Sequence, residues 1–396
     1  SPVLPLVHRR ARLKDFFRAC DSTCTRDSIL ASTTGEDGLD SARKMVTPSL
    51  YLQGKGVVYH LGQRAQAYGN RAIVIGGKTA LAVVGDKVRK SLESNGIEVA
   101  LWEDGVSECT MATVNRLAAA GAKAAPHFVV GVGGGKAVDT AKAVAWKLKV
   151  PAVIVGTQCA TNADTSAEVV LYTEDHVFVE WLTMPRNPVL VIEDTDVLAK
   201  APAKFLVWGM GDALSTKFEG EAYAKARLKK KDGGVPTTAA LALADGCYKV
   251  LMEHGLKALH DVQSGVHSRD VDDVIEAVKL SSGMAFENTG CALAHALHNG
   301  LKRTGEAEGE HGEVVAYCTI VQMVYEGRRR EEVSAVKAWC EKVGLPTSLK
   351  ARGSPSKAAL RKAADYAAAK DPDSRNMPER MRPQDILKAM EAVEAL

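Results

Sequence analysis

The feature that most constrains this chain is the regular alternation of short apolar runs with amphipathic segments over its first half. The apolar runs are rich in β-branched residues, and several end in glycine. Residues 79–96 and about 136–148, which lie between runs, show helical periodicity. Strands that alternate with helices along a chain form parallel sheets. We therefore predict strands of one parallel sheet at residues 71–77, 97–102, 127–135 and 151–156.

The pattern changes after these runs. Residues 169–181 hold two alternating apolar segments around Glu174-Asp175-His176, which predicts a β-hairpin. A last strand is predicted at 188–195, and beyond about residue 201 the pattern is helical with no clear strand run. We expect an α/β fold with an N-terminal parallel-sheet domain at 46–200 and a C-terminal all-helical domain at 201–396.

Residues 1–45 form a distinct N-terminal extension. The stretch from His8 to Cys20 is basic and partly amphipathic, and the stretch after it is polar and rich in Ser, Thr and Gly. A targeting segment, a solvated arm and an expression remnant all have such a composition, and Asp15 and Asp21 argue against targeting. We expect a cytoplasmic protein, with the mitochondrion or another organelle as the alternative if this extension belongs to a targeting segment.

Composition excludes several kinds of partner. The chain has 51 Lys and Arg against 48 Asp and Glu, a balance that is atypical of nucleic-acid binders. No run approaches the roughly 18 apolar residues that a membrane-spanning helix needs. Its eight cysteines show neither a zinc-binding spacing nor the density of a disulfide-stabilised domain, so we expect a reducing compartment. The expected partner is a small molecule.

A glycine-rich turn is the first signal of function. In GVGGGKAVDTAKAVA, a predicted strand leads through Gly133, Gly134 and Gly135 into a predicted helix. Glycines let a ligand approach the backbone, and a helix N-terminus offers free N–H groups and a positive dipole, so a pyrophosphate can bind there. This context favours a dinucleotide-binding domain. The turn equally suits a tight strand-to-helix connection, and its spacing differs from the G-x-G-x-x-G fingerprint.

A histidine group is the second signal. His295 and His298 share one helical face, and His311 comes from a separate segment. With Asp212 of WGMGDALST they offer the nitrogen and oxygen ligands of a metal of borderline hardness, such as zinc. The alternative is a set of core histidines and a helix-capping aspartate.

Together these stretches carry a resemblance to a known family. From about residue 44 onward the chain resembles the glycerol dehydrogenases of the iron-containing (group III, metal-dependent) alcohol dehydrogenase superfamily. The matching stretches are GVGGGKAVDTAKAVA, LYTEDHVFVEWLTMPRNP, APAKFLVWGMGDALSTKFEGEA, CALAHALHNG and HGEVVAYCTIVQ.

The resemblance implies roles for individual residues. Asp212, His295 and His311 would hold one catalytic divalent metal, usually zinc with iron as the alternative, and His298 would shape the substrate and nicotinamide pocket. A homo-oligomer, by analogy an octamer, is also implied. The residues implied in binding the cofactor are Gly77, Gly133, Gly134, Gly135, Lys136, Asp139, Thr157, Ala160, Ser166, Glu168 and Tyr172.

The chemistry implied by the resemblance is hydride transfer. Three protein ligands leave zinc open to substrate hydroxyls, and zinc lowers the pKa of a bound alcohol. The expected reaction is oxidation of glycerol or a similar vicinal diol at the secondary carbon to a hydroxyketone, with hydride transfer to a nicotinamide cofactor. The reverse reduction is equally expected.

Two positions depart from the family pattern. Where the family reads S-T-D-A-P-T-S-A, this chain has Asn162 in place of the aspartate that contacts glycerol, and Asp164 two positions later is a candidate for a displaced role. Asn162 loses the negative charge and one acceptor. Gly77 stands where NAD-using relatives have a ribose-binding aspartate, which leaves room for a 2′-phosphate beside Lys78. We expect NAD, with NADP as the alternative.

Two other classes remain open at the level of sequence. One is a metal- and NAD-binding lyase similar to dehydroquinate synthase, which has a related fold, although GMGDALST and HALHNG resemble the dehydrogenases more. The other is a non-enzymatic descendant of the fold, and the presence of all three candidate ligands argues against it.

Overall fold

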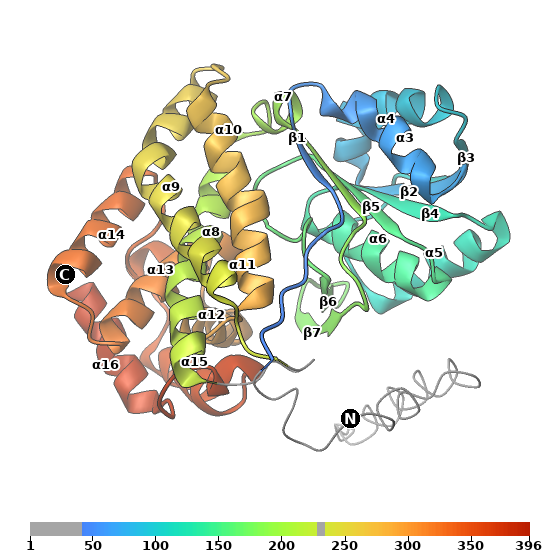
Figure 1. Ribbon diagram of the computed structural model, residues 1–396. Coiled ribbons are helices and arrows are strands. Elements are labelled where there is room, and N and C mark those ends of the chain that lie inside the picture. Colours follow the sequence, from blue (N-terminus) through green and yellow to red (C-terminus); the bar gives the residue numbers. More distant parts are fainter. Residues whose placement is uncertain (1–41, 228–233) are drawn as a thin grey trace, which may run out of the picture.

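A six-stranded parallel sheet forms the N-terminal half of the molecule (Figure 1). The computed structural model describes residues 42–227 and 234–396. The strand order is β1-β8-β5-β4-β2-β3, and every neighbouring pair is parallel. The strands are β1 (Tyr51–Gly54), β2 (Arg71–Gly76), β3 (Glu98–Glu103), β4 (Phe128–Gly133), β5 (Ala152–Gly156) and β8 (Leu190–Asp194).

Helices cover this sheet because its central strands are apolar on both faces. Every residue of β4 is buried, and β5 and β8 are buried almost throughout. Strands of this kind need cover on both sides. Much of that cover comes from α4 (Lys78–Glu93), α5 (Met111–Ala124) and α6 (Gly135–Leu148). Helices α4 and α6 lie where helices were predicted, and α5 lies in the segment between two predicted strands.

The sequence analysis missed one edge of the sheet. β1 pairs with β8, but its sequence, YLQG, has neither the length nor the alternation that marks a strand. Short turns of helix follow it, at η2 (Val57–His60), α3 (Leu61–Ala65) and η3 (Gln66–Tyr68). The predicted hairpin is present as β6 (Glu168–Tyr172) and β7 (Phe178–Thr183), an antiparallel pair apart from the main sheet.

Helices make up the rest of the molecule. After the short α7 (Thr195–Leu198), the described residues hold no further strand beyond one isolated bridge between Arg43 and Val235. A large apolar core joins these helices. They are α8 (Ala203–Ala226), α9 (Thr238–Gln263), α10 (Arg269–Glu276), the π-helical turn η4 (Ala277–Ser281), α11 (Ser282–Asn288), α12 (Leu293–Thr304), α13 (His311–Tyr325), α14 (Arg330–Lys342), α15 (Lys357–Ala369) and α16 (Pro383–Glu394), with short turns η5 (Lys350–Arg352) and η6 (Pro372–Arg375).

The predicted fold class, a parallel sheet with flanking helices followed by a helical half, is confirmed. We place the boundary between the two halves in residues 199–202, between α7 and α8. The N-terminal extension lies almost wholly outside the described residues, so the choice between a targeting segment, a solvated arm and an expression remnant stays open.

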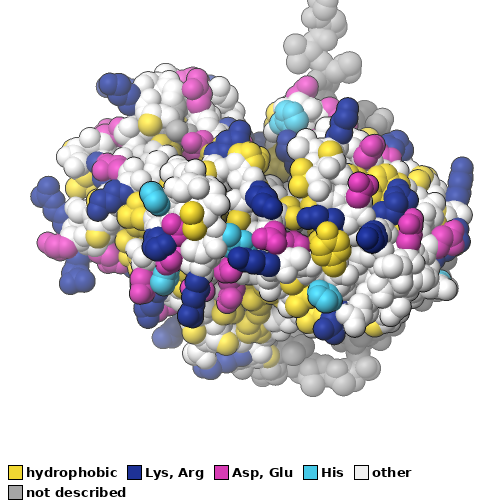
Figure 2. Space-filling model, turned by 90° about the horizontal axis from the view of Figure 1, so that it is seen from above, with side chains coloured by type: hydrophobic (Ala, Val, Ile, Leu, Met, Phe, Trp, Pro, Cys, Tyr) yellow, Lys and Arg dark blue, Asp and Glu magenta, His cyan; other side chains and the backbone are white. Residues whose placement is uncertain are grey.

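Surface and cysteine features agree with the composition. On the face shown in Figure 2, Lys and Arg side chains are interspersed with Asp and Glu. None of the helices in 42–227 and 234–396 is long and apolar enough to cross a membrane. The cysteines in those residues are free thiols, namely Cys109, Cys159, Cys247, Cys291, Cys318 and Cys340.

Candidate active site

A cleft runs between the sheet half and the helical half. Its lining on the sheet side includes the glycine turn and the loop between β5 and β6. Its lining on the helical side includes Asp212, His295, His298 and His311. Both sequence signals therefore face the same space. Clefts between domains are common places for ligand sites.

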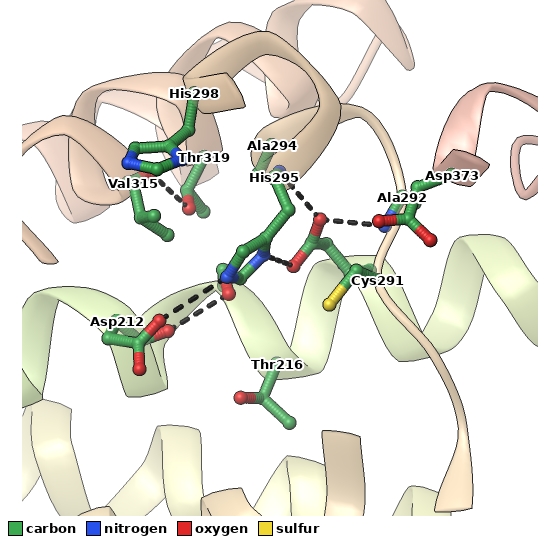
Figure 3. A network of polar contacts seen from close by, with 12 residues as sticks. Asp212, Thr216, Cys291, Ala292, Ala294, His295, His298, Val315, Thr319 and Asp373 are labelled. Carbon is green, nitrogen blue, oxygen red and sulfur yellow. Dashed lines mark hydrogen bonds and ion pairs between the residues drawn. The ribbon is translucent and has the colours of Figure 1, made fainter. Parts of the chain in front are cut away.

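Three of the predicted residues converge on one point of this cleft. Asp212 lies in the middle of α8, His295 in the first turn of α12, and His311 is the first residue of α13. Asp212 Oδ1 is 3.4 Å from His295 Nε2 and 3.3 Å from His311 Nε2 (Figure 3 shows Asp212 and His295). These atoms lie within 4.8 Å of one another, as the ligands of a single metal ion do.

The neighbouring imidazoles keep Asp212 ionised despite its burial. Burial alone would raise its pKa, but the imidazoles of His311 and His295 outweigh that effect and hold the pKa of Asp212 below its usual range. The side chain of His311 is 46% exposed, whereas that of Asp212 is 8% exposed. The anionic ligand is thus enclosed, and the group opens to the cleft on the His311 side.

Glu219 fixes the orientation of His295. Its Oε2 is 2.6 Å from His295 Nδ1, and its Oε1 accepts the backbone N–H groups of Ala292 and His295 at 2.7 and 2.9 Å. Metal-binding histidines usually present their second ring nitrogen to a carboxylate or carbonyl in this way. Glu219 therefore leaves Nε2 of His295 as the nitrogen available to a metal.

His298 stands behind His311. Its Nε2 is 3.2 Å from His311 Nδ1, and its Nδ1 is 3.0 Å from Asn299 Oδ1. Burial, together with the nearby His311 and His295, lowers the pKa of His298 well below its usual value. His298 is therefore a neutral imidazole beside a candidate ligand, and its place agrees with the predicted pocket-shaping role.

The residues present fit a divalent metal. Two imidazole nitrogens and one carboxylate oxygen suit zinc, and iron accepts the same donors. A second such group, formed by Glu219, Cys291 and His295, is a weaker candidate. Burial raises the pKa of the Cys291 thiol to about 12, and Glu219 already accepts three hydrogen bonds. Asp212, His295 and His311 are the better ligand set.

The glycine turn on the opposite wall is built for close approach. Gly133 ends β4 with a φ of +150°, a conformation that side chains disfavour, and α6 begins at Gly135. A Cβ at Gly134 would lie 2.0 Å from Gln158 Nε2. Gly133, Gly134 and Gly135 all line the cleft, and the free backbone N–H groups of a helix N-terminus suit a phosphate.

The other predicted cofactor residues divide into two sets. Lys136 reaches the cleft, but its Nζ is 2.9 Å from Glu108 Oε2, so its charge is already paired. Asp139 is buried, pairs with Lys142 and accepts the N–H of Val170, so its side chain supports the hairpin. The remaining predicted residues also line the cleft, and one of them, Glu168, accepts from Thr183 Oγ1 at 2.9 Å. These residues are Gly77, Thr157, Ala160, Ser166, Glu168 and Tyr172.

Asn162 and Asp164, which lie two positions apart in the stretch 160–167, have different surroundings. Asn162 lines the cleft, and its Nδ2 donates to Ser282 Oγ at 2.8 Å. Asp164 is fully buried and pairs with Lys279. A displaced substrate-binding role for Asp164 is therefore wrong, because its carboxylate has no access to the cleft.

Sequence reasoning missed the residues that hold the site residues in place. These residues are buried and charged, and most of their partners lie far away along the chain, so the sequence gives little reason to single them out. They are Glu219, Glu108, Lys142 and Lys279. Glu219 carried one usable signal, since it lies two helical turns after Asp212 and so on the same face of α8.

Comparisons with known proteins agree with this geometry. Residues 48–195 match the family model of iron-containing alcohol dehydrogenases. A glycerol dehydrogenase of Citrobacter freundii is 41% identical over 308 residues, covering 78% of this chain and 84% of the relative. One of Escherichia coli O6:H1 is 38% identical over 353 residues, covering 88% and 95%.

Solved structures agree as well. The crystal structure of glycerol dehydrogenase from Schizosaccharomyces pombe gives a TM-score of 0.84 at 31% identity, covering 90% of this chain and 91% of that one. The structure of a probable glycerol dehydrogenase from Sinorhizobium meliloti 1021 gives 0.82 at 35% identity, covering 89% and 99%.

Fold, site and relatives together define a metal-dependent alcohol dehydrogenase that uses a nicotinamide cofactor. The chain belongs to the iron-containing alcohol dehydrogenase family, among its glycerol dehydrogenases. The enzyme class predicted from the sequence is confirmed, and the lyase and non-enzymatic alternatives are set aside.

Proposed function

We propose that this protein oxidises glycerol or a similar vicinal diol at the secondary carbon to a hydroxyketone such as dihydroxyacetone, and catalyses the reverse reduction. The observation that carries the proposal is the convergence of Asp212, His295 and His311 on the cleft wall opposite the glycine turn. The names of the relatives support the substrate class.

In this proposal the three residues bind one zinc ion, with iron as the alternative. A divalent ion held by these residues would supply positive charge that favours loss of a proton from a substrate hydroxyl, and a bound nicotinamide would supply the hydride acceptor. Glu219 keeps His295 in the ligating tautomer, and His298 keeps His311 oriented. The turn at Gly133–Gly135 would hold the pyrophosphate of the dinucleotide.

We propose NAD as the physiological cofactor, with NADP as the alternative. Gly77 caps the N-terminus of α4 and lines the cleft with Lys78. A Cβ at Gly77 would lie 3.6 Å from the carbonyl oxygen of Val106, an ordinary contact, so this position has space for a larger group. That space and Lys78 are what support NADP as the alternative.

We also propose a homo-oligomer, an octamer by family analogy, in a reducing compartment such as the cytoplasm. The free thiols of the described cysteines support the reducing compartment. Sedimentation velocity of the purified chain measures the oligomer.

Metal analysis combined with a substrate screen tests the proposed function. The purified protein should hold about one zinc per chain and should reduce NAD or NADP with glycerol and other diols. Removal of the metal by a chelator should abolish turnover, and added zinc should restore it. Full turnover in metal-free protein, or no turnover of any vicinal diol by metal-loaded protein, contradicts the proposal.

Asn162 sharpens the substrate assignment. With Nδ2 donating to Ser282, its remaining acceptor is a neutral carbonyl oxygen. A hydrogen bond to a charged group is worth about 1.5–3 kcal/mol, so glycerol should be a poor but detectable substrate. Asn162→Asp should lower the KM for glycerol about tenfold or more and leave the metal content unchanged. Asn162→Ala is the matched control, and equal effects of both substitutions on all diols would show that this position does not tune substrate choice.

A further inference from the structure

The loop between β5 and β6, residues 158–167, has no helix or strand of its own yet carries Asn162 on the cleft wall. Two buried lysines hold its carbonyl groups. Lys142 of α6 donates from Nζ to the carbonyl oxygens of Ala163 and Ser166 at 2.8 and 3.2 Å, and also to that of Glu168. Lys142 belongs to the same half of the molecule as the loop.

Lys279 holds the same loop from the other half. It lies in the π-helical turn η4, and its Nζ donates to the carbonyl oxygens of Gln158 and Thr161, each at 3.2 Å. It also pairs with Asp164 of the loop. π-turns are rare and are found frequently at functional sites.

The Lys279 contact is completely enclosed. Lys279, Asp164 and Glu193 are each fully buried, and Glu193 Oε1 is 3.7 Å from Lys279 Nζ. Burial alone would lower the pKa of Lys279, but the two carboxylates raise it above its usual value, so the side chain is an ammonium ion. Burying a charge is costly, and hydrophobic residues of similar volume often stabilise a fold as well. The stability of the fold alone therefore does not explain why a charged side chain is buried at position 279.

The contacts of Ser282, the first residue of α11, lead to the wall of the cleft that carries Asp212, His295 and His311, here called the metal wall. Ser282, three residues after Lys279, accepts from Asn162 Nδ2 and lies 3.1 Å from Thr216 Oγ1 on α8. Thr216 is one helical turn from Asp212 on the same helix (Figure 3). The loop that carries Asn162 is thus connected, contact by contact, to the helix that carries a candidate metal ligand.

Two glycines of the helical half allow this close approach. A Cβ at Gly209 of α8 would lie 1.7 Å from the carbonyl oxygen of Cys159, and one at Gly283 of α11 would lie 2.1 Å from Thr165 Oγ1. The loop therefore packs closely against the helical half, and Lys279 donates hydrogen bonds to loop carbonyl groups within that contact.

We propose that Lys279 is a positioning residue that sets the distance between Asn162 and the metal wall and so determines how the enzyme binds its polyol. This proposal rests on the proposed function for its substrate. Lys142 shapes the loop within the sheet half, whereas Lys279 alone of these two lysines ties the loop to the half that holds Asp212, His295 and His311.

The test uses the full-length, metal-loaded enzyme and the double variant Lys279→Met/Asp164→Asn. The double substitution removes the buried ion pair as a unit, so an unpaired charge does not dominate its stability. We expect metal content and the NADH dissociation constant to change by less than about threefold, whereas the KM for glycerol should rise at least about tenfold. Hydrogen exchange in residues 158–167 should accelerate about tenfold or more, with α8 unchanged.

Lys217→Met is the matched control. Lys217 also pairs with two carboxylates, Glu221 and Asp245, but has no contact with the loop. It should leave the KM and the exchange of the loop as in the wild type. A double variant with wild-type KM and wild-type loop exchange overturns the proposal.

Ser282→Ala decides the matter if the double variant does not fold. It removes the partner of Asn162 Nδ2 without changing any charge, and it should raise the KM for glycerol about threefold or more at unchanged metal content. An unchanged KM overturns the proposal. If the wild type oxidises no diol, the proposed function fails, and loop exchange in the variants still tests the anchoring by Lys279.

Discussion

The two walls of the cleft are built to bind by different means. On the sheet wall, the glycine turn Gly133–Gly135 offers backbone N–H groups, and the neighbouring Lys136 is already paired with Glu108. On the helical wall, the candidate ligands are side chains, and each imidazole is held from behind by a second side chain. The sheet wall thus depends on the absence of side chains, and the helical wall depends on their identity.

This difference predicts opposite sensitivities. Adding a single methyl group on the sheet wall should impair cofactor binding, while replacing a polar side chain there should matter less. On the helical wall, a change of one polar atom at constant size should impair metal binding. The predictions below test this contrast, from the largest expected effect to the smallest.

Loss of a ligand on the helical wall should have the largest effect. His295→Ala removes a nitrogen donor from the candidate metal group, while its backbone stays in place in α12. The charge of a metal is worth several kcal/mol to the reaction, and each 1.4 kcal/mol or so is a factor of ten, so turnover should fall at least about a hundredfold. Metal analysis and diol oxidation check this together.

An exposed histidine of the same half provides the control. His260→Ala, in α9, should change neither metal content nor turnover. Wild-type metal content and turnover in His295→Ala would remove His295 from the ligand set and with it the proposed metal centre.

Replacing one atom of Glu219, the side chain that supports the candidate ligand His295, should have the next largest effect. Glu219→Gln keeps the size but replaces an oxygen acceptor by an N–H donor, so one of three donors loses its acceptor. Substitution of such supporting groups typically weakens metal affinity 10- to 100-fold. Competition with a zinc-binding indicator dye measures the metal affinity. Glu221→Gln is the control, because Glu221 lies on the same helix but pairs with Lys217 and Arg328. Equal losses in both variants would contradict the role of Glu219.

The sequence was informative where neighbouring residues determine the structure. The parallel sheet was predicted because apolar runs alternate with helical segments along the chain, and strands such as Phe128–Gly133 are apolar throughout and end at glycines. The hairpin around His176 followed from its alternation and turn residues. β1 escaped prediction because four residues at a sheet edge carry no periodic signal, and their pairing partner β8 lies some 140 residues later in the chain.

Only the candidate metal ligands of the site were predictable from the sequence. Asp212, His295 and His311 belong to motifs whose residue types suit the chemistry, and the structure brings them together. Lys279 could not be predicted, because its partners Gln158, Thr161 and Asp164 lie more than 110 residues away and two of them contribute only backbone atoms. A buried charged residue can be recognised from the sequence only when its counter-charge lies nearby in the chain.

A methyl group on the sheet wall should weaken cofactor binding. In Gly133→Ala the Cβ would lie 2.9 Å from Ala137 Cβ, at a φ of +150° that side chains disfavour. Such strain costs about 1–3 kcal/mol, and relief by shifting the turn should raise the NADH dissociation constant about tenfold or more. Gly96→Ala is the control, since Gly96 also has a positive φ but has nothing within 4 Å of an added Cβ. It should lower the thermal midpoint and leave NADH binding unchanged. Unaltered NADH binding in Gly133→Ala would contradict a backbone-built cofactor site.

The smallest expected effect is a change of cofactor preference at the edge of the sheet wall. Gly77→Asp has space for its side chain, because an added Cβ would make only an ordinary contact with Val106. A carboxylate there should accept hydrogen bonds from the ribose hydroxyls of NAD and repel the 2′-phosphate of NADP. Lys78 and the N-terminus of α4 partly offset the added charge, so the ratio of kcat/KM for NAD to that for NADP should rise about five- to tenfold.

Gly77→Asn separates charge from size in that test. It adds nearly the same volume without the negative charge, so it should disturb both cofactors alike and leave their ratio close to that of the wild type. Repeating both measurements at higher salt should reduce the effect of Gly77→Asp, because screening weakens a charge–charge repulsion at a solvent-accessible site. If Asp and Asn at this position shift the ratio equally, the effect does not depend on charge, and repulsion of the 2′-phosphate is contradicted. If neither substitution shifts the ratio, Gly77 does not face the ribose, and the sheet wall distinguishes the two cofactors, if at all, by other residues.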